Sequence, residues 1–566
     1  MSFRASIHVL AALTAVLVAG GAMAAPAKKP MAPAPIINVP IPVARSTVYD
    51  QVFDPAISAM RAALRNAATE KSVDRGDISG VAVYYAAGGY VPLWIVDGKL
   101  TDRAEALLKR LADAAADGLN PANFPVPPAD FGTTATPSLA DVAAADIKLS
   151  LALVAYARQA YAGQLVPSSI SPNIGYTRHL PDPSGVLRSL ILADDPAATL
   201  SAYNPPQEEF AQLRDLLARL RKEAETEKTV LIPDGQNLKP GMKDPRVPLL
   251  RERFELPAYV QKVGWIAKPS EELVYDKALV AAVEAFQKSQ NIKADGVIGK
   301  GTLAAINNEG SDDHIATVLA NMERWRWMPR YLGRYYVRVN IPDFTLDVHK
   351  DGSIIHSTRI VVGKVELQTP IFSDEIQHII VNPAWNVPAS IIQKEYLPAL
   401  KNGGYPKGFD VFAKVGGRFR AVDPRTVDWA SVSANDVQFR QPPGERNALG
   451  VVKFMFPNKY AVYLHDTPSK SLFNNPYRAY SHGCMRVENP WAFADALLTE
   501  EGFDSTRLKK LVGTGEKRVD LREHIYVHIT YFTAWVNADG EPEFRKDVYG
   551  HDKRVEQALG LLPARS

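Results

Sequence analysis

The chain contains a single cysteine, Cys484, among its 566 residues. A lone cysteine cannot form a disulfide within its own chain, so this thiol is not an internal cross-link. Two roles are left for it. It is either a small buried apolar group or a reactive thiolate, and the residues around it decide between them.

The chain also lacks an excess of charge of one sign. Its 65 basic residues stand against 62 acidic ones, which gives a formal net charge of +3. Binding to nucleic acid usually requires a strong basic field, so we expect no nucleic acid among the partners. With 46% hydrophobic and 22% charged residues, the composition is that of folded globular domains, and the length favours several of them.

A long apolar run is missing from the N-terminal region. The run from Val9 to Val18 is shorter than the roughly 20 residues of a membrane span. Arg4 precedes it and Ala22-Met23-Ala24 follows it, which is typical of a secretory signal peptide. We predict a signal peptide over residues 1–24, a Pro- and Ala-rich linker over 25–45, and export to the periplasm. Membrane contact is expected only through a signal segment that stays uncleaved.

Helical periodicity follows the linker and predicts a mainly α scaffold domain over residues 46–230. Its predicted helices cover Thr101–Ala115, Ile147–Ala162 and Glu208–Thr226. A smaller unit is predicted over 231–308, with a helix from Asp276 to Ser289, a turn at Asp295-Gly296 and a helix from Gly299 to Ile306. Residues 309–334 are interpreted as a connecting segment.

The pattern then changes to alternating apolar residues, which predicts a mainly β domain over 335–535. Residues 388–446 show few strand signals and are predicted to be an insertion that acts as a lid or is disordered. Residues 536–566 are interpreted as a C-terminal tail. The expected strands lie at Tyr336–Ile341, Thr358–Val362, Glu375–Val381, Ala461–Leu464 and His524–Phe532.

Cys484 belongs to this β domain and lies in the run Ser481-His482-Gly483-Cys484-Met485-Arg486. A cysteine nucleophile requires a base, donors for an oxyanion and an open cleft. His465, at the end of a strand predicted to begin at Tyr460, is the candidate base, and Tyr463 is expected on the same face. Gly483 permits a sharp turn, and Arg486 suits a carboxylate. Each residue also has a structural interpretation: a packed histidine, an internal ion pair for Arg486, or a turn capped by Ser481.

The spacing from His465 to the Ser481–Arg486 run resembles the signature of the L,D-transpeptidase catalytic domain, also called the YkuD domain. Residues 283–303 resemble the small three-helix peptidoglycan-binding module. Together with the segment Glu323-Arg324-Trp325-Arg326-Trp327, these features are similar to the large YcbB-like subgroup of that family.

The resemblance implies Cys484 as nucleophile, His465 as its base, and Ser481, His482 and Gly483 as residues that shape the oxyanion site. It further implies substrate contacts for Arg486 and Tyr463, and for Trp429 in a capping subdomain. The implied partners are donor and acceptor peptidoglycan stem peptides and glycan strands. No metal or organic cofactor is implied, and carbapenems are expected inhibitors.

The implied reaction forms 3-3 cross-links through a thioester and releases the terminal D-alanine of a tetrapeptide stem. The acceptor stays open between a second stem, a free D-amino acid and a lipoprotein amine. One alternative is an L,D-carboxypeptidase that hydrolyses the same stem with the same Cys484 and His465. A second alternative is a wall-binding protein without catalysis, in which the module around Phe286 carries the function.

Overall fold

The structure is a computed structural model, and it describes residues 54–71, 73–226, 230–257, 261–263, 266–268, 273–289, 293–308, 311–404 and 407–561. The predicted signal peptide (1–24) and linker (25–45) lie outside the described residues. Among the residues inside these ranges, no helix combines the length and the apolar character of a membrane span.

The first part of the described chain is a helical domain, as the sequence predicts. Its central helix begins earlier than expected, at Leu139, because Ser138 and Asp141 form reciprocal hydrogen bonds between side chain and backbone at its N-terminus. The helices are α2 (Pro55–Ala67), α3 (Arg75–Ala87), α4 (Asp102–Ala112), α5 (Leu139–Ala162), α6 (Pro167–Ile170), α7 (Pro183–Leu192), α8 (Pro196–Ser201) and α9 (Glu208–Thr226), with a short hairpin of β1 (Ile95–Val96) and β2 (Lys99–Leu100).

The next unit contains the three helices expected of the small module. They are α10 (Val247–Arg253), α11 (Lys277–Ser289) and α12 (Lys300–Asn308), and a hairpin of β3 (Gln261–Val263) and β4 (Ile266–Lys268) accompanies them. Leu279, Val283 and Phe286 of α11 are buried, as their spacing predicts, and they pack with Leu303 and Ile306 of α12.

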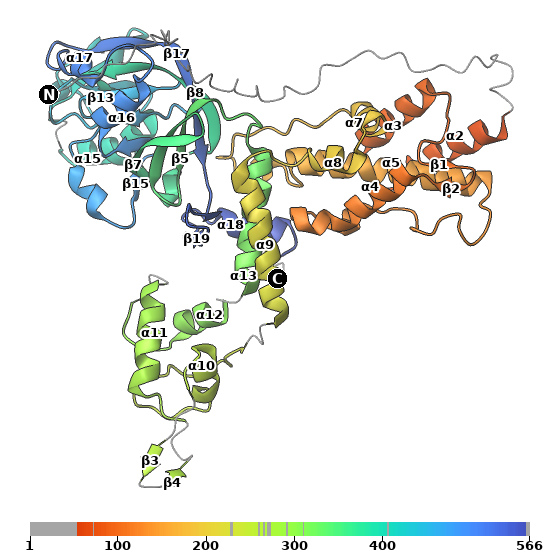
Figure 1. Cartoon of the computed structure of the whole chain (residues 1–566). Coiled ribbons are helices and arrows are strands. Elements are labelled where there is room, and N and C mark those ends of the chain that lie inside the picture. The colour runs from red at the N-terminus through yellow and green to blue at the C-terminus, as the bar shows by residue number, and fades with distance from the viewer. Residues whose placement is uncertain are drawn as a thin grey trace, which may run out of the picture. The chain divides into compact units, whose positions relative to one another are not determined.

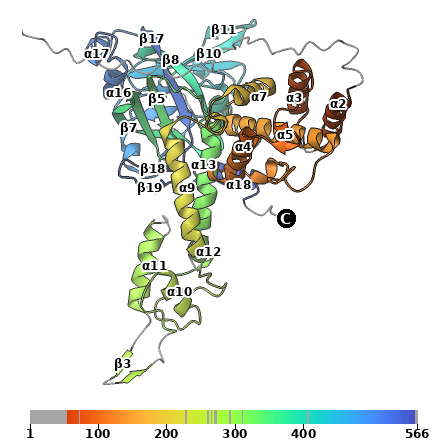
Figure 2. The same cartoon turned by 45° about the vertical axis from the view of Figure 1, so that its right-hand side comes forward.

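The predicted connecting segment is a long helix, α13 (Ser311–Trp327), which runs beside α9 in both views of the fold (Figures 1 and 2). It carries the Glu323–Trp327 motif. Glu323 is fully buried and accepts hydrogen bonds from the Leu165 backbone N–H (2.8 Å) and from Trp327 Nε1 (3.1 Å). Arg324 pairs with Asp552 at 2.5 Å. The motif therefore joins the end of α5 to the C-terminal part of the chain.

The β domain is one nine-stranded sheet with the order β15-β7-β16-β14-β13-β8-β17-β5-β6. Because β6 also pairs with β7, eight of these strands close on themselves around a shared core. The strands are β5 (Tyr335–Asn340), β6 (Thr345–Lys350), β7 (Ser353–Gly363), β8 (Phe372–Val381), β13 (Val452–Met455), β14 (Leu464–His465), β15 (Ala479–Ser481), β16 (Met485–Val487) and β17 (Lys517–Thr530). The helices α16 (Pro490–Leu497) and α17 (Ser505–Lys509) follow β16.

One strand prediction is wrong in extent. The chain from Tyr460 to Tyr463 is not a strand, and β14 contains only Leu464 and His465. The Asn458 side chain accepts hydrogen bonds from the Tyr460 and Val462 N–H groups, and Ala461 has a φ of 54°, so the chain turns here. The turn ends just before β14, so His465 lies within the sheet.

The insertion has more strand structure than the sequence predicts. It forms a separate four-stranded sheet with the order β11-β10-β12-β9, packed on short helices around buried Ile392, Val411 and Phe439. These strands are short and flanked by charged residues, which hides their alternation. The elements are β9 (Trp385–Asn386), α14 (Ala389–Ile391), a π-helical turn (Ile392–Tyr396), α15 (Leu397–Lys401), β10 (Asp410–Val415), β11 (Arg418–Ala421) and β12 (Val437–Gln441).

The predicted C-terminal tail is folded over most of its length. After β18 (Ala534–Val536) it forms β19 (Pro542–Phe544) and α18 (His551–Ala558), and Tyr549, His551 and Val555 are buried. α18 is too short for its sequence to show a clear helical periodicity. It is stabilised by its contacts with α13.

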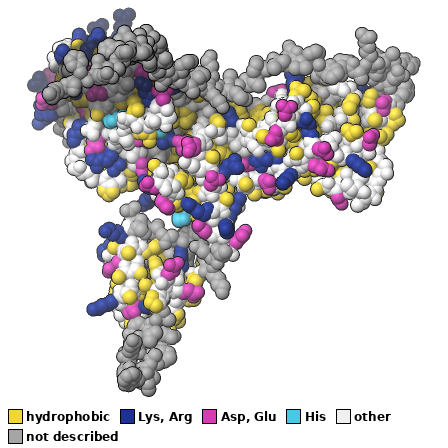
Figure 3. Space-filling model, in the orientation of Figure 1, with side chains coloured by type: hydrophobic (Ala, Val, Ile, Leu, Met, Phe, Trp, Pro, Cys, Tyr) yellow, Lys and Arg dark blue, Asp and Glu magenta, His cyan; other side chains and the backbone are white. Residues whose placement is uncertain are grey.

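The surface carries both signs of charge. On the face drawn in Figure 3, basic and acidic side chains are mixed among apolar and neutral ones, in keeping with the net charge of +3.

Candidate active site

Two neighbouring strands bring the predicted site residues together. β14 and β16 are parallel, with Leu464 opposite Met485 and His465 opposite Arg486. Leu464 and Met485 are fully buried in the sheet core. Because side chains alternate along a strand, His465 and Arg486 lie on the other face of the sheet. Cys484 directly precedes β16, and Tyr463 directly precedes β14, so both extend this face.

The turn before Cys484 is fixed by side-chain hydrogen bonds. Gly483 has a φ of 113°, which an L-residue with a side chain rarely adopts. The Ser481 hydroxyl accepts a hydrogen bond from the Gly483 N–H at 3.1 Å and donates one to the Cys484 carbonyl at 2.5 Å. Ser481 thus spans the turn, and the Gly483 N–H is engaged with it.

His465 is 5% exposed, and its tautomer follows from its contact. Its Nδ1 lies 2.5 Å from the Asp466 carbonyl oxygen. A carbonyl can only accept, so Nδ1 carries the proton and Nε2 keeps its lone pair. The Asp466 carboxylate is held in turn by Lys470 Nζ (2.7 Å) and by the Val451 N–H (3.0 Å). His465 is therefore oriented as a neutral imidazole with a basic Nε2.

Burial disfavours the charged forms of both candidate groups. It lowers the pKa of His465 to about 4, and the charge of Arg486 acts in the same direction. It raises the pKa of Cys484 to about 11, although hydrogen bonds from the Tyr463 backbone and side chain and the charges of Lys453 and Arg486 oppose this. Both residues are neutral in the resting protein at pH 7.

Tyr463 and Arg486 lie near the Cys484 thiol, and substrate contacts for both stay predictions. The pKa of Tyr463 is raised, first by burial and then by the neighbouring Cys484. Burial lowers the pKa of Arg486. Among the described residues, Arg486 Nε has no hydrogen-bond partner, so its guanidinium has a donor available for a bound anion.

Lys453 is a further residue of the site that the sequence analysis did not identify. It lies on β13 opposite His465, and its Nζ lies 5.4 Å from the centre of the Tyr463 ring. Burial lowers its pKa, while Glu516 and Cys484 raise it. The sequence indicates its position only through the apolar residues on either side, Val452 and Phe454. Because both are buried, Lys453 points to the opposite face of the sheet, which is the face of His465.

The insertion reaches the nucleophile loop through Glu395. Its carboxylate contacts His482 Nε2 and lies 4.0 Å from Lys364 Nζ. Trp429, by contrast, is partly buried and packs against the insertion's own core, where its Nε1 donates to the Pro424 carbonyl at 3.0 Å and its ring stacks on Phe439. Contact between Trp429 and a substrate stays a prediction.

Three parts of the chain match known protein families. Residues 334–519 match the L,D-transpeptidase catalytic domain (YkuD), residues 79–217 match a family described as "Scaffold domain", and residues 253–306 match one described as "Putative peptidoglycan binding domain". A curated protein from Haemophilus influenzae described as "Putative L,D-transpeptidase" is 34% identical over 241 residues, which cover 42% of this chain and 48% of that protein. The chain thus spans about half the length of this curated relative.

Solved structures of L,D-transpeptidases also overlap with the chain. One from Mycobacterium smegmatis has 14% identity and a TM-score of 0.18, covering 35% of this chain and 58% of that one. Another from Xylanimonas cellulosilytica has 17% identity and a TM-score of 0.16, covering 53% and 99%.

The closed β domain with Cys484 and His465 on one face, and the family match that covers both residues, define the class of this part of the protein. Residues 334–519 are similar to the L,D-transpeptidase catalytic domains of the YkuD family, and other parts of the same chain match a scaffold domain and a putative peptidoglycan-binding domain.

Proposed function

We propose that this chain is a peptidoglycan L,D-transpeptidase that uses Cys484 as its nucleophile and His465 as the base. The observation that carries the proposal is the pairing of β14 with β16, which sets a neutral histidine and the cysteine on one face inside the matched domain. The hydrogen bond from His465 Nδ1 to the Asp466 carbonyl supports Nε2 as the proton acceptor.

The first half of the reaction makes a thioester. Cys484 Sγ attacks the carbonyl carbon of the third residue of a tetrapeptide stem while its proton passes to His465 Nε2. The tetrahedral oxyanion collapses, the bond to the terminal D-alanine breaks, and His465 returns the proton to the leaving amine. Because burial favours the neutral forms of the thiol and the imidazole, we propose that the proton passes to His465 during the attack.

The second half transfers the acyl group. An amine of the acceptor stem attacks the thioester carbonyl, gives its proton to His465 and forms the 3-3 cross-link, and the Cys484 thiolate leaves and regains that proton. The spare donor of Arg486 supports a role in holding a stem carboxylate, and Tyr463 beside the thiol supports a role in lining the cleft. We propose that the protein is exported and acts at the cell wall, where the peptidoglycan-binding domain holds glycan strands.

The proposal is tested by the mass of the product. Purified full-length protein is incubated with disaccharide tetrapeptide, and the mixture is analysed by mass spectrometry. A cross-linked dimer that lacks one terminal D-alanine is expected, and none is expected from Cys484→Ala. A tripeptide as sole product would support the L,D-carboxypeptidase alternative, and no product from the wild type would support a binding protein.

A further inference from the structure

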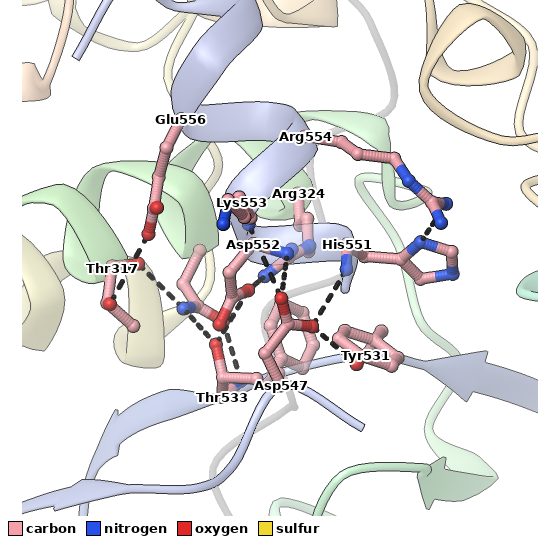
Figure 4. A network of polar contacts seen from close by, with 12 residues as sticks. Thr317, Arg324, Tyr531, Thr533, Asp547, His551, Asp552, Lys553, Arg554 and Glu556 are labelled. Carbon is pink, nitrogen blue, oxygen red and sulfur yellow. Dashed lines mark hydrogen bonds and ion pairs between the residues drawn. The ribbon is translucent and has the colours of Figure 1, made fainter. Parts of the chain in front are cut away.

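Hydrogen bonds and ion pairs hold the C-terminal segment around α18 in place (Figure 4). The Asp547 carboxylate accepts hydrogen bonds from the Tyr531 hydroxyl (2.6 Å) and from the N–H groups of His551 (2.8 Å) and Asp552 (3.0 Å). Asp547 therefore holds the first turn of α18 against Tyr531.

A second set of contacts fastens α18 to α13. Asp552 pairs with Arg324 at 2.5 Å and accepts a hydrogen bond from the Thr533 hydroxyl at 3.0 Å. Thr533 and Asn321 of α13 exchange two hydrogen bonds, of 2.8 and 2.9 Å. The residues between Asp547 and Asp552 are thus held from both sides.

Tyr549, between those two anchors, reaches the loop that follows β7. Its ring is 2% exposed, and its N–H donates to the Tyr531 hydroxyl at 2.6 Å. Its own hydroxyl donates to the Gly363 carbonyl at 2.6 Å and accepts from the Thr369 N–H at 3.2 Å. This single hydroxyl closes the loop from residue 363 to residue 369 across its two ends.

Thr369 connects this loop to the turn before Cys484 by hydrogen bonds. Its fully buried hydroxyl accepts from the Gly363 N–H at 2.9 Å and donates to the Gly483 carbonyl at 2.8 Å. In a trans peptide unit the C=O and the following N–H point in opposite directions. With the Gly483 carbonyl bound to Thr369, the Cys484 N–H is directed away from Thr369.

We propose that Thr369 and Tyr549 are positioning residues, which lock the Gly483–Cys484 peptide so that the Cys484 N–H is presented to the oxyanion formed on the substrate. This inference rests on the proposed function, because it assigns a task within the same acyl transfer. It also gives the folded C-terminal segment a role in a site to which it contributes no reacting group. Gly483 N–H is bound to Ser481, which leaves the Cys484 N–H as the donor that the turn orients.

The test compares two reactions of the same thiol in full-length protein. Acylation by a carbapenem passes through a tetrahedral oxyanion, whereas alkylation by iodoacetamide does not. Thr369→Val removes the hydroxyl at nearly constant volume, Thr369→Ser retains it, and Tyr549→Phe removes only the second hydroxyl. Tyr331→Phe, at a side chain that is 49% exposed, is the matched control.

We expect Thr369→Val to slow acylation by about tenfold to a hundredfold, somewhat less than the loss of a whole oxyanion donor. Alkylation should stay within about twofold of the wild type, because it needs no oxyanion donor. Thr369→Ser should restore acylation, Tyr549→Phe should slow it by a smaller factor, and Tyr331→Phe should change neither reaction. Equal losses in both reactions, or unchanged acylation in both hydroxyl-deletion variants, would overturn the inference. Tyr549→Phe decides the matter if Thr369→Val does not fold.

Amide hydrogen exchange separates this inference from the proposed function. The peptide that contains residues 481–486 should exchange faster in Thr369→Val and in Tyr549→Phe than in the wild type and Tyr331→Phe. Unchanged exchange contradicts the positioning role even if the wild type is acylated. A wild type that is not acylated contradicts the proposed function, while faster exchange in the variants still supports the lock.

Discussion

At the scale of single residues, the protonation of Cys484 and His465 follows from their burial. Desolvation raises the pKa of the thiol to about 11 and lowers that of the imidazole to about 4, so the resting pair is neutral. This differs from a thiolate–imidazolium pair, in which the cysteine is ionised before substrate arrives. The chemistry then depends on proton transfer to His465 during the attack.

The pH dependence of alkylation tests this protonation state. Because only the thiolate reacts with iodoacetamide, the rate constant should rise about tenfold per pH unit between pH 6 and 9, without a plateau. The rate is measured by mass spectrometry of the intact protein. A plateau with a midpoint below pH 8 would mean a preformed ion pair and would contradict the neutral resting state.

Lys453 gives a second prediction at this scale. Its charge lowers the pKa of Cys484, so Lys453→Met should raise that pKa further. Alkylation at pH 8 should become roughly threefold to tenfold slower, as expected for one nearby charge in a partly screened site. Lys459→Met, at an exposed lysine over the Tyr460 ring, should leave the rate unchanged. Equal alkylation rates in both variants would contradict an effect of the Lys453 charge on the pKa of Cys484.

At the scale of elements, the nucleophile turn depends on how closely its neighbouring loop approaches. A Cβ atom on Gly363 would lie 2.2 Å from the Leu367 carbonyl oxygen and 2.7 Å from the Thr369 nitrogen. Both are backbone atoms, so the loop would have to move. The same loop holds Gly483 through Thr369, and its displacement would reach the turn before Cys484.

Gly363→Ala should therefore destabilise the protein by more than about 2 kcal/mol, as other severe packing clashes do. Gly352→Ala is the matched control in the β6–β7 turn: its φ is 81° and no atom lies within 4 Å of the added Cβ. It should cost about 1 kcal/mol from backbone strain alone. Urea unfolding of both variants measures the difference, and equal losses would contradict the clash.

Much of the element structure could be predicted from the sequence, because long periodic helices and buried strands are locally encoded. The helix from Glu208 to Thr226 and the burial of Leu279, Val283 and Phe286 are confirmed. The prediction of a strand from Tyr460 is wrong because the Asn458 side chain stabilises a turn there, despite the alternation of polar and apolar residues. The short strands of the insertion and α18 were missed because tertiary contacts, more than periodicity, define them.

The site residues proposed from the sequence all lie within one stretch of the chain, apart from Trp429. The run from Ser481 to Arg486 and the position of His465 can be read from the chain, and β14 and β16 bring them together. Three residues reach the site from separate strands, loops and helices: Lys453, Thr369 and Glu395. Tyr549 acts through Thr369 and Gly363. Such long-range contacts leave no local pattern, so only the folded structure reveals them.

At the scale of the whole molecule, buried histidines link folding to pH. Burial is the main cause of lowered pKa values at His465 and His528, to about 4, and at His349 and His551, to about 3. An unfolded histidine titrates near pH 6.5. Between these values the unfolded chain binds more protons than the native one, so stability falls as the pH drops below about 6.5.

The free energy of unfolding should therefore decrease from pH 7 to pH 4.5, by up to about 1.4 kcal/mol per pH unit for each such histidine. His349→Phe keeps the stacking on Tyr336, whose ring centre lies 4.5 Å away, and removes one titrating group. It should reduce the slope by about one proton. Urea unfolding at several pH values measures both slopes, and a stability independent of pH over this range would contradict the linkage.

Detection of the acyl-enzyme tests the proposed acyl transfer by Cys484 most directly. The full-length protein is mixed with a disaccharide tetrapeptide whose terminal D-alanine carries an isotope label, quenched in acid and analysed by peptide mapping. A disaccharide-tripeptide adduct on Cys484 is expected, with the label released and no adduct on Cys484→Ala. An adduct that retains the label, one that persists in Cys484→Ala, or no adduct on the wild type would contradict it.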